Sequence, residues 1–406
     1  MADRLSLRIV VNSVSWEPPA RKGPNHMSKK PLGAIVGLAA SCLFLAACGS
    51  SASTSNETEA PLASSGPASL APTLSNPGKA CVILPDTESS DRWETADRPL
   101  LEQAFTAVGV EFDIQNADGD KAKFATIADG MLASGCSVLV ITNLDSISGA
   151  EVIAKADMAG VPVIDYDRLT LTGGARYYVS FDNVAVGTAI GEGLVKCLND
   201  AGTTDGPVAL LNGSPTDNNS TLLKQGYRGA IEGAGFKVTA DEGVPDWDNA
   251  KAGTIFEEMY TKAKGGFVGV AAANDALAGA GISIIESNGK AGKIFVTGQD
   301  ATDEGLQRIL LGTQCMTVYK SVKQEADNAA ALAVALINND IAGADALATA
   351  ITIDTETTGE VPSVLLVPQA IYAENVKDVI ADGYTTADKI CTTDELKAAC
   401  TKYGVS

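Results

Sequence analysis

Short apolar runs alternate with amphipathic stretches along the first half of the chain. The runs are ACVILP (80–85), EFDIQNA (111–117), SVLVITN (137–143) and VPVIDYD (161–167), and the stretch KAKFATIADGMLASG (121–135) is typical of those between them. The runs have the length and composition of buried strands, and the stretches have the periodicity of helices. Buried strands separated by helices predict a parallel sheet with crossover helices.

The same alternation restarts after RYYVSFDN (176–183). A helical stretch follows, and then the apolar runs PVALLNG (207–213), GFVGVAAAND (266–275), KIFVTGQD (293–300) and QCMTVYK (314–320). We therefore predict an α/β fold made of two doubly wound parallel-sheet lobes. No shorter sequence repeat is visible, which excludes solenoids and propellers.

The first 78 residues lack this alternation. Residues 27–47 combine Lys29 and Lys30 with an apolar stretch, and the small residues before Cys48 resemble a bacterial lipobox. This is the layout of a lipoprotein signal peptide, and the alternatives are a plain secretory signal or a transmembrane anchor. We interpret residues 1–26 as an over-extended start and the Ser/Ala/Pro/Thr-rich residues 48–78 as a flexible tether. The expected protein is exported and anchored to the outer face of the cell membrane by a lipid on Cys48.

Removal of residues 1–47 would make the chain more acidic. It leaves 24 Lys and Arg residues against 48 Asp and Glu residues, a net charge of −24. Such a charge argues against nucleic acid or anionic lipid as a partner. It also removes the only histidine, His26, which excludes His-dependent catalysis and His-ligated metal sites. We expect a monomer with no cofactor and no metal.

Six further cysteines follow the tether. No CxxC pair occurs among them, so a zinc or redox site is weakly supported, whereas an even number in an exported chain suggests disulfides. Six cysteines allow 15 arrangements, so the pairing is a hypothesis. The expected pairs are Cys81–Cys136, Cys197–Cys315 and Cys391–Cys400.

Nearly every predicted strand ends in a side chain that can form hydrogen bonds. Ligands of open α/β sheets bind beyond the carboxyl ends of the strands. Carboxylates, guanidinium groups and amides can bracket vicinal hydroxyls, whereas phosphate calls for the motifs GxGxxG or GxxxxGK[ST], which the chain lacks. Trp93 and Trp247, one in each predicted lobe, lie in polar stretches and could stack on a sugar ring. These features predict a sugar site.

The motifs YDR, SFDN, GSPTDNN, AND, GQDA and GTQCMTVYK occur in this order. Through them, residues 81–384 resemble the periplasmic D-xylose-binding proteins of the ribose/galactose-type binding family, and glucose/galactose-binding relatives share several of the motifs. The resemblance implies a hinged two-lobed receptor that closes on one monosaccharide and presents it to an ABC permease. D-xylose is the expected ligand, with glucose or galactose as the alternative. The implied sugar contacts are Arg92, Trp93, Asp167, Arg168, Asn218, Trp247, Asn274, Asp300 and Lys320.

The resemblance also implies that the chain crosses three times between the lobes. We expect these crossings near Asn183, Lys320 and Asp354. The expected sugar-binding lobes are residues 79–183 with 321–353, and residues 184–320 with 354–406.

Other functional classes make different demands on the sequence. A glycosidase would need two carboxylates that flank a glycosidic bond, and Asp167 with Asp300 could form such a pair. The resemblance assigns both to binding, so we expect no enzyme activity. A sugar-responsive repressor would need a helix-turn-helix where this chain has its signal and tether. A sugar sensor for chemotaxis or signalling uses the same binding physics and stays open.

Overall fold

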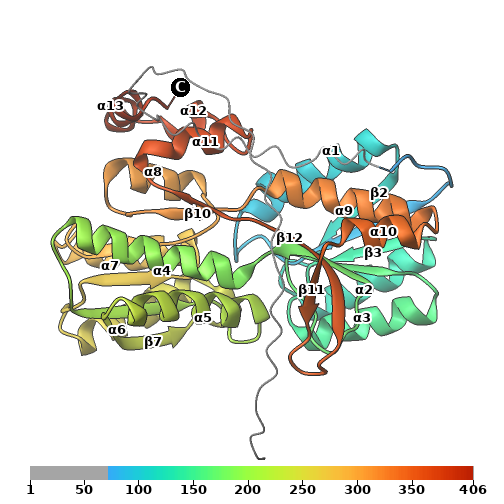
Figure 1. Cartoon of the computed structure of the whole chain (residues 1–406), viewed down its shortest axis with the longest axis horizontal. Coiled ribbons are helices and arrows are strands. Elements are labelled where there is room, and N and C mark those ends of the chain that lie inside the picture. Colours follow the sequence, from blue (N-terminus) through green and yellow to red (C-terminus); the bar gives the residue numbers. More distant parts are fainter. Residues whose placement is uncertain (1–71, 406) are drawn as a thin grey trace, which may run out of the picture. The chain divides into compact units, whose positions relative to one another are not determined.

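The computed structural model describes residues 72–405. The predicted signal peptide, Cys48 and most of the predicted tether lie outside the described residues. Among the described helices, none is long and apolar enough to cross a membrane. The described part of the chain forms two separate helix-covered parallel sheets, seen on the right and left of Figure 1.

The first lobe is built on a seven-stranded sheet. Its strands are β1 (Lys79–Leu84), β2 (Glu111–Asn116), β3 (Val138–Ile141), β4 (Val163–Tyr166), β5 (Tyr177–Phe181), β11 (Ala350–Ile353) and β12 (Glu360–Leu366). Their order is β11-β12-β5-β4-β3-β1-β2. All neighbours are parallel apart from β11 and β12, which are antiparallel. The doubly wound sheet predicted from the alternation is confirmed here.

Helices cover both faces of this sheet because its central strands are apolar on both sides. Ala80, Val82 and Leu84 of β1 face one core, whereas Cys81 and Ile83 face the other, as the two-residue period of a strand requires. The first core contains residues of α1, α9 and α10, and the second contains residues of α2 and α3. The bounds of these helices are α1 (Arg98–Val108), α2 (Lys121–Ala133), α3 (Ser146–Met158), α9 (Val322–Ile337) and α10 (Ile341–Leu347).

The second lobe is built on a four-stranded parallel sheet. Its strands are β6 (Pro207–Asn212), β7 (Lys237–Gly243), β8 (Gly269–Ala272) and β9 (Phe295–Thr297). Their order is β7-β6-β8-β9, and all neighbours are parallel. Its helices are α4 (Asn183–Asp200), α5 (Asn218–Gly233), α6 (Asn249–Lys262), α7 (Asp275–Ser287) and α8 (Asp303–Leu311).

A two-stranded pair and a C-terminal segment complete the second lobe. The pair is antiparallel and consists of β10 (Thr317–Tyr319) and β13 (Gln369–Ile371). The C-terminal segment, residues 372–405, packs against α8 through its own small core, which includes Ile390 and Leu396. Figure 1 shows its helices beyond α8. They are α11 (Val376–Ala381), α12 (Ala387–Ile390) and α13 (Asp394–Tyr403).

The chain passes between the lobes after β5, after β10 and after β12. The predicted third crossing near Asp354 is wrong, because residues 360–366 form β12, which pairs in parallel with β5 of the first sheet. The turn at Asp354 instead joins β11 to β12 as an antiparallel hairpin. The chain therefore stays in the first lobe until Leu366, and the predicted lobe boundary lies too early.

The three expected cysteine pairs lie at disulfide distance. Cys81 of β1 and Cys136 before β3 come from neighbouring strands. The Cα–Cα distances are 5.9 Å for Cys81–Cys136, 6.5 Å for Cys197–Cys315 and 6.2 Å for Cys391–Cys400.

Candidate ligand-binding site

A small pocket lies between the two lobes, at the carboxyl ends of their strands. Its free volume is about 30 Å³, and side chains of both lobes contact each other around it. Eight of the nine residues expected to contact sugar line it: Arg92, Trp93, Asp167, Arg168, Trp247, Asn274, Asp300 and Lys320. Sequence reasoning missed five further lining residues as contacts: Ser89, Ser90, Asp217, Asn219 and Gln299.

Asn218 is the one residue expected to contact sugar that does not line the pocket. Asp217 is the N-cap of α5, and its side chain accepts a hydrogen bond from the backbone of Asn219. Asn218 is half-buried and does not line the pocket, whereas Asn219 is buried and does. Neighbouring side chains on a helix point about 100° apart, so only one of the two can face the cleft. The motif DNN does not say which one.

Arg92 is the centre of a buried charge network in the first lobe. Its guanidinium group donates twice to Asp97, at 2.8 and 2.9 Å, and once to Glu325 Oε2, at 3.1 Å. Its Nη1 lies 3.1 Å from Asp167 Oδ2, which faces the pocket. A bidentate pair fixes the guanidinium plane, so Asp97 sets the direction in which Arg92 presents Nη1. Asp97 and Glu325 do not line the pocket, and no motif marks them.

Asp167 is held by both lobes. Its backbone oxygen accepts hydrogen bonds from Tyr178 Oη at 2.9 Å, Ser180 Oγ at 2.8 Å and Asn219 Nδ2 at 2.9 Å. Its carboxylate also lies 3.2 Å from the ammonium of Lys320. These contacts offset an unusual backbone, because Asp167 has a φ of 63°, in the left-handed region that non-glycine residues rarely occupy.

Positive φ angles recur among the pocket residues. Trp247 has a φ of 57° and Asp300 a φ of 92°. Each such residue costs on the order of 1–3 kcal/mol of backbone strain and persists where the surroundings over-determine it. Strain of this kind clusters at functional sites, so its presence in three pocket residues supports a binding role for the pocket.

The charges of the pocket stabilise each other. Burial would raise the pKa of Asp167, but the positive charges of Lys320, Arg92 and Arg168 outweigh it and lower that pKa to about 2. Burial would lower the pKa of Lys320, but Asp167 and Asp300 raise it above its usual value. Both groups are therefore ionised at neutral pH. Burial and the nearby charge of Asp167 raise the pKa of Glu325 well above its ordinary range, so Glu325 favours its protonated form.

The two tryptophans have different surroundings. The Trp93 ring lies under the guanidinium groups of Arg92 and Arg168, at 4.5 and 5.4 Å from the ring centroid, so cations already use its π-surface. Trp247 donates its indole N–H to Asp217 at 3.1 Å. Its ring packs against Gly213, where a Cβ atom would lie 2.1 Å from the ring. A glycine is therefore required beneath Trp247.

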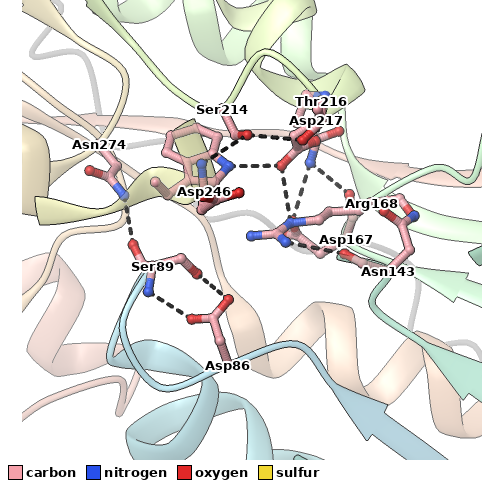
Figure 2. Close-up of polar contacts among 12 residues, drawn as sticks. Asp86, Ser89, Asn143, Asp167, Arg168, Ser214, Thr216, Asp217, Asp246 and Asn274 are labelled. Atoms are coloured by element: carbon pink, nitrogen blue, oxygen red, sulfur yellow. Dashed lines mark hydrogen bonds and ion pairs between the residues drawn. The ribbon is translucent and has the colours of Figure 1, made fainter. Parts of the chain in front are cut away.

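Polar contacts also join the lobes around the pocket. Arg168 Nε lies 3.1 Å from Asp217 Oδ2, and Asn274 Nδ2 donates to the backbone oxygen of Ser89 at 3.2 Å. Figure 2 shows Arg168 directed toward Asp217 and the side chain of Asn274 directed toward Ser89. Trp247 and Arg168 meet at the same oxygen of Asp217, which makes this carboxylate a junction between the lobes.

Two buried hydrogen-bond acceptors of the second lobe have no hydrogen-bond donor among the described residues. These acceptors are Gln299 Oε1 and Asp300 Oδ1. Lys320 Nζ lies 3.4 Å from Asp300 Oδ1, an ion-pair distance without hydrogen-bond geometry. Unpartnered buried acceptors are costly, so these two atoms mark where a ligand with hydroxyl donors would gain most. Residues 72–405 hold no cluster of His, Cys, Asp and Glu side chains suited to a metal ion.

Comparison with known proteins identifies the family. Residues 81–341 match the model of the periplasmic binding protein domain. The chain belongs to the periplasmic binding protein family. This family consists of solute-binding proteins, and the resemblance seen in the sequence is confirmed.

The chain is similar in sequence to several sugar-binding proteins of this family. The chain is 33% identical over 305 residues to the D-xylose-binding periplasmic protein of Haemophilus influenzae, covering 74% of this chain and 88% of the relative. It is also 33% identical over 299 residues to the Escherichia coli protein of that name, covering 72% and 87%. A multiple sugar-binding periplasmic receptor of Rhizobium radiobacter is 29% identical over 344 residues, covering 77% and 92%.

Solved structures share the type I periplasmic binding protein fold. A carbohydrate-transporter solute-binding protein of Chloroflexus aurantiacus, in complex with D-glucose, has a TM-score of 0.68 and 27% identity, and the match covers 76% of this chain and 97% of that one. A Clostridium phytofermentans solute-binding protein with bound β-D-glucose has a TM-score of 0.69 and 26% identity, with 77% and 99% covered. The predicted fold class is confirmed.

Proposed function

We propose that this periplasmic binding protein captures a monosaccharide, D-xylose, between its two lobes and delivers it to the permease of an ABC importer. The observation that carries the proposal is the composition of the pocket. Charged donors held in place by Asp97 and Asp167 face Gln299 Oε1 and Asp300 Oδ1 of the second lobe, which accept no hydrogen bond from residues 72–405. A sugar hydroxyl both donates and accepts, so a polyol matches this mixed set better than an anion or a cation does.

Binding would work through closure of the lobes. Arg92 and Asp167 belong to the first lobe and Trp247, Gln299 and Asp300 to the second. A ligand that contacts both sets gains its full binding energy only when the lobes meet, and it therefore favours the closed arrangement. In this account the protein needs no covalent step and no cofactor.

The choice of D-xylose rests on relatives. Two D-xylose-binding periplasmic proteins share 33% identity with this chain over most of their length. Glucose is the second candidate, because two structures with TM-scores of 0.68 and 0.69 contain D-glucose. Xylose lacks the hydroxymethyl group of glucose, so the two sugars differ in the room they need beside the ring.

A fluorescence titration tests the proposal. Without residues 1–48 the protein keeps only Trp93 and Trp247, and both line the pocket. It is titrated with xylose, glucose, galactose, arabinose and ribose. A saturable response to xylose alone supports xylose as the ligand, whereas a stronger response to glucose or galactose moves the substrate to the second candidate. Silence toward all five sugars, repeated by calorimetry, would overturn the proposal.

We further propose that the protein is an exported, monomeric lipoprotein with three disulfides. The lipid anchor is supported by the signal-like residues 27–47 and by Cys48, which follows them. The disulfides are supported by the three cysteine pairs at disulfide distance. Replacement Cys48→Ser is expected to move the protein from the membrane pellet to the soluble fraction, and retention in the pellet contradicts the lipid anchor. Non-reducing peptide mapping that finds six free thiols contradicts the disulfides.

A further inference from the structure

Lys320 lies where the chain crosses from the second lobe to the first, between carboxylates of both lobes. It follows β10 at the crossing from the second lobe to the first, and Ser321 after it is the N-cap of α9. Its ammonium lies 3.2 Å from Asp167 of the first lobe and 3.4 Å from Asp300 of the second. The conformation of this crossing therefore decides whether Lys320 reaches both carboxylates.

The two neighbours of Lys320 share one partner. Tyr319 Oη donates to Asp382 Oδ2 at 2.6 Å, and Ser321 Oγ donates to the same oxygen at 2.7 Å. Both donors are buried, whereas Asp382 is exposed. Successive side chains of an extended chain point to opposite sides, so a carboxylate that holds the neighbours on one side directs Lys320 toward the pocket on the other.

Asp382 is itself well anchored in the second lobe. It is the C-cap of α11 in the C-terminal segment, and Tyr384 two residues later packs against Tyr319 with ring centroids 5.3 Å apart. The segment is fixed on α8 by a buried core that includes Ile390 and Leu396. Asp382 therefore ties the last residue of β10 and the cap of α9 to a fixed support. It lies beyond residue 341, where the match to the family model ends.

We propose that Asp382 is a positioning residue that fixes Lys320 in the ligand pocket by holding the hydroxyl groups of Tyr319 and Ser321. The proposal rests on the proposed sugar-binding function, because it assigns Lys320 a place among the sugar contacts. Asp382 acts at the crossing between the lobes and does not line the pocket. Loss of its carboxylate removes the hydrogen bonds that hold Tyr319 and Ser321, and the Lys320 ammonium can then move away from Asp167 and Asp300.

The test measures xylose and glucose affinity by calorimetry for the protein without residues 1–48. Asp382→Ala is expected to weaken affinity by about two- to thirtyfold, the range of mutations that act on a site without touching its ligand. Asp388→Ala is the matched control, because Asp388 is an exposed carboxylate of the same segment. It is expected to bind as the wild type does. Thermal unfolding of each unliganded variant separates lost positioning from lost folding.

A second comparison shows whether Asp382 acts through its two donors. In the double variant Tyr319→Phe with Ser321→Ala, the change Asp382→Ala is expected to cause no further loss of affinity, because the contacts that it would break are already absent. A purely structural role would lower the melting temperature without this dependence of affinity on the two hydroxyls. If Asp382→Ala fails to fold, the change in affinity of Tyr319→Phe and of Ser321→Ala decides the question.

The outcomes distinguish the two proposals. Sugar binding by the wild type with affinity unchanged in Asp382→Ala overturns the positioning role and leaves the proposed function intact. A loss of equal size in the presence and absence of the two hydroxyls also overturns it. A wild type that binds no sugar overturns both.

Discussion

The two halves of the pocket differ in how far their hydrogen-bonding capacity is already used. On the first-lobe side, Arg92 donates three hydrogen bonds to Asp97 and Glu325, and Tyr178 and Ser180 of the same lobe hold the backbone oxygen of Asp167. On the second-lobe side, Gln299 Oε1 and Asp300 Oδ1 have no hydrogen-bond partner within residues 72–405. The polar side chains of the first lobe are therefore fixed before a ligand binds. The second lobe offers acceptors whose hydrogen bonds form only with a ligand.

This difference assigns separate tasks to the lobes. Groups that are fixed beforehand lose little entropy when a ligand arrives, so they give affinity at low cost. Groups that are satisfied only by a ligand make closure depend on that ligand. Mutations in the first half should therefore disturb the protein's own charge balance as well as binding, whereas mutations in the second half should affect binding with less effect on folding.

The largest expected effect is at Asp167. Replacement Asp167→Ala leaves Arg92 and Lys320 facing each other in a buried site without their shared carboxylate. Truncation of one partner of a buried, hydrogen-bonded charge pair at a binding site costs about 2–5 kcal/mol of affinity, and we expect a loss of sugar affinity of this order by calorimetry. Asp113→Ala is the control, because Asp113 pairs with Lys79 at the surface. A variant that binds sugar like the wild type would show that the fixed polar side chains of the first lobe are not needed.

A smaller loss is expected in the second half of the pocket. Trp247→Ala should weaken sugar affinity by about 1–3 kcal/mol, the range for loss of an aromatic anchor. Trp247→Phe keeps an apolar face and should retain part of the affinity. The same measurements on Gly213→Ala, whose new Cβ would meet the indole ring, should resemble those on Trp247→Ala. Unchanged affinity with intact folding would remove Trp247 from the site.

A still smaller loss of affinity is expected at Asn219, and its neighbour Asn218 serves as the control. Asn219→Ala removes a donor to the backbone oxygen of Asp167 and should lower affinity by about 0.5–1.5 kcal/mol, the net value of a hydrogen bond. Asn218→Ala should leave affinity within error, because Asn218 does not line the pocket. Isothermal titration of both variants is sufficient, and a loss confined to Asn218→Ala would restore the original sequence prediction.

The smallest expected effect is that of pH near neutrality. The folded-state pKa of Asp167 is about 2, below the ordinary value of 3.8. A lowered pKa stabilises the folded state above the unfolded pKa, and this contribution is lost as pH falls through the folded pKa. The difference in unfolding free energy between the wild type and Asp167→Asn should therefore shrink as pH falls from about pH 4 toward pH 2. Urea unfolding that shows it shrinking between pH 7 and 5 would contradict the assigned charge state.

Local sequence pattern was sufficient for the sheets and for much of the pocket. The alternation of apolar runs and helical stretches reports burial directly, and in parallel strands the carboxyl ends share one edge. This is why Asp167, Asn274 and Asp300 could be grouped in advance. It could not resolve Asn218 from Asn219, because the choice depends on where α5 begins, which is fixed by Asp217 as its cap.

The local sequence pattern could not predict contacts between residues that lie far apart in the sequence. Glu325 meets Arg92 across 233 positions in sequence, and neither it nor Asp97 belongs to a motif that points to the pocket. The third crossing was misplaced for a similar reason, because the pairing of β12 with β5 depends on the tertiary arrangement of the first sheet. Apolar periodicity identifies a strand without naming its neighbour.

The positions of the cysteine pairs determine which properties of the protein would change on reduction. Cys81–Cys136 lies within the first lobe, Cys197–Cys315 within the second, and Cys391–Cys400 within the C-terminal segment. As disulfides, all three would stiffen a unit that moves as a body, and none would cross the hinge. Reduction would therefore lower the heat tolerance of each unit while leaving the opening angle and the choice of sugar unaffected.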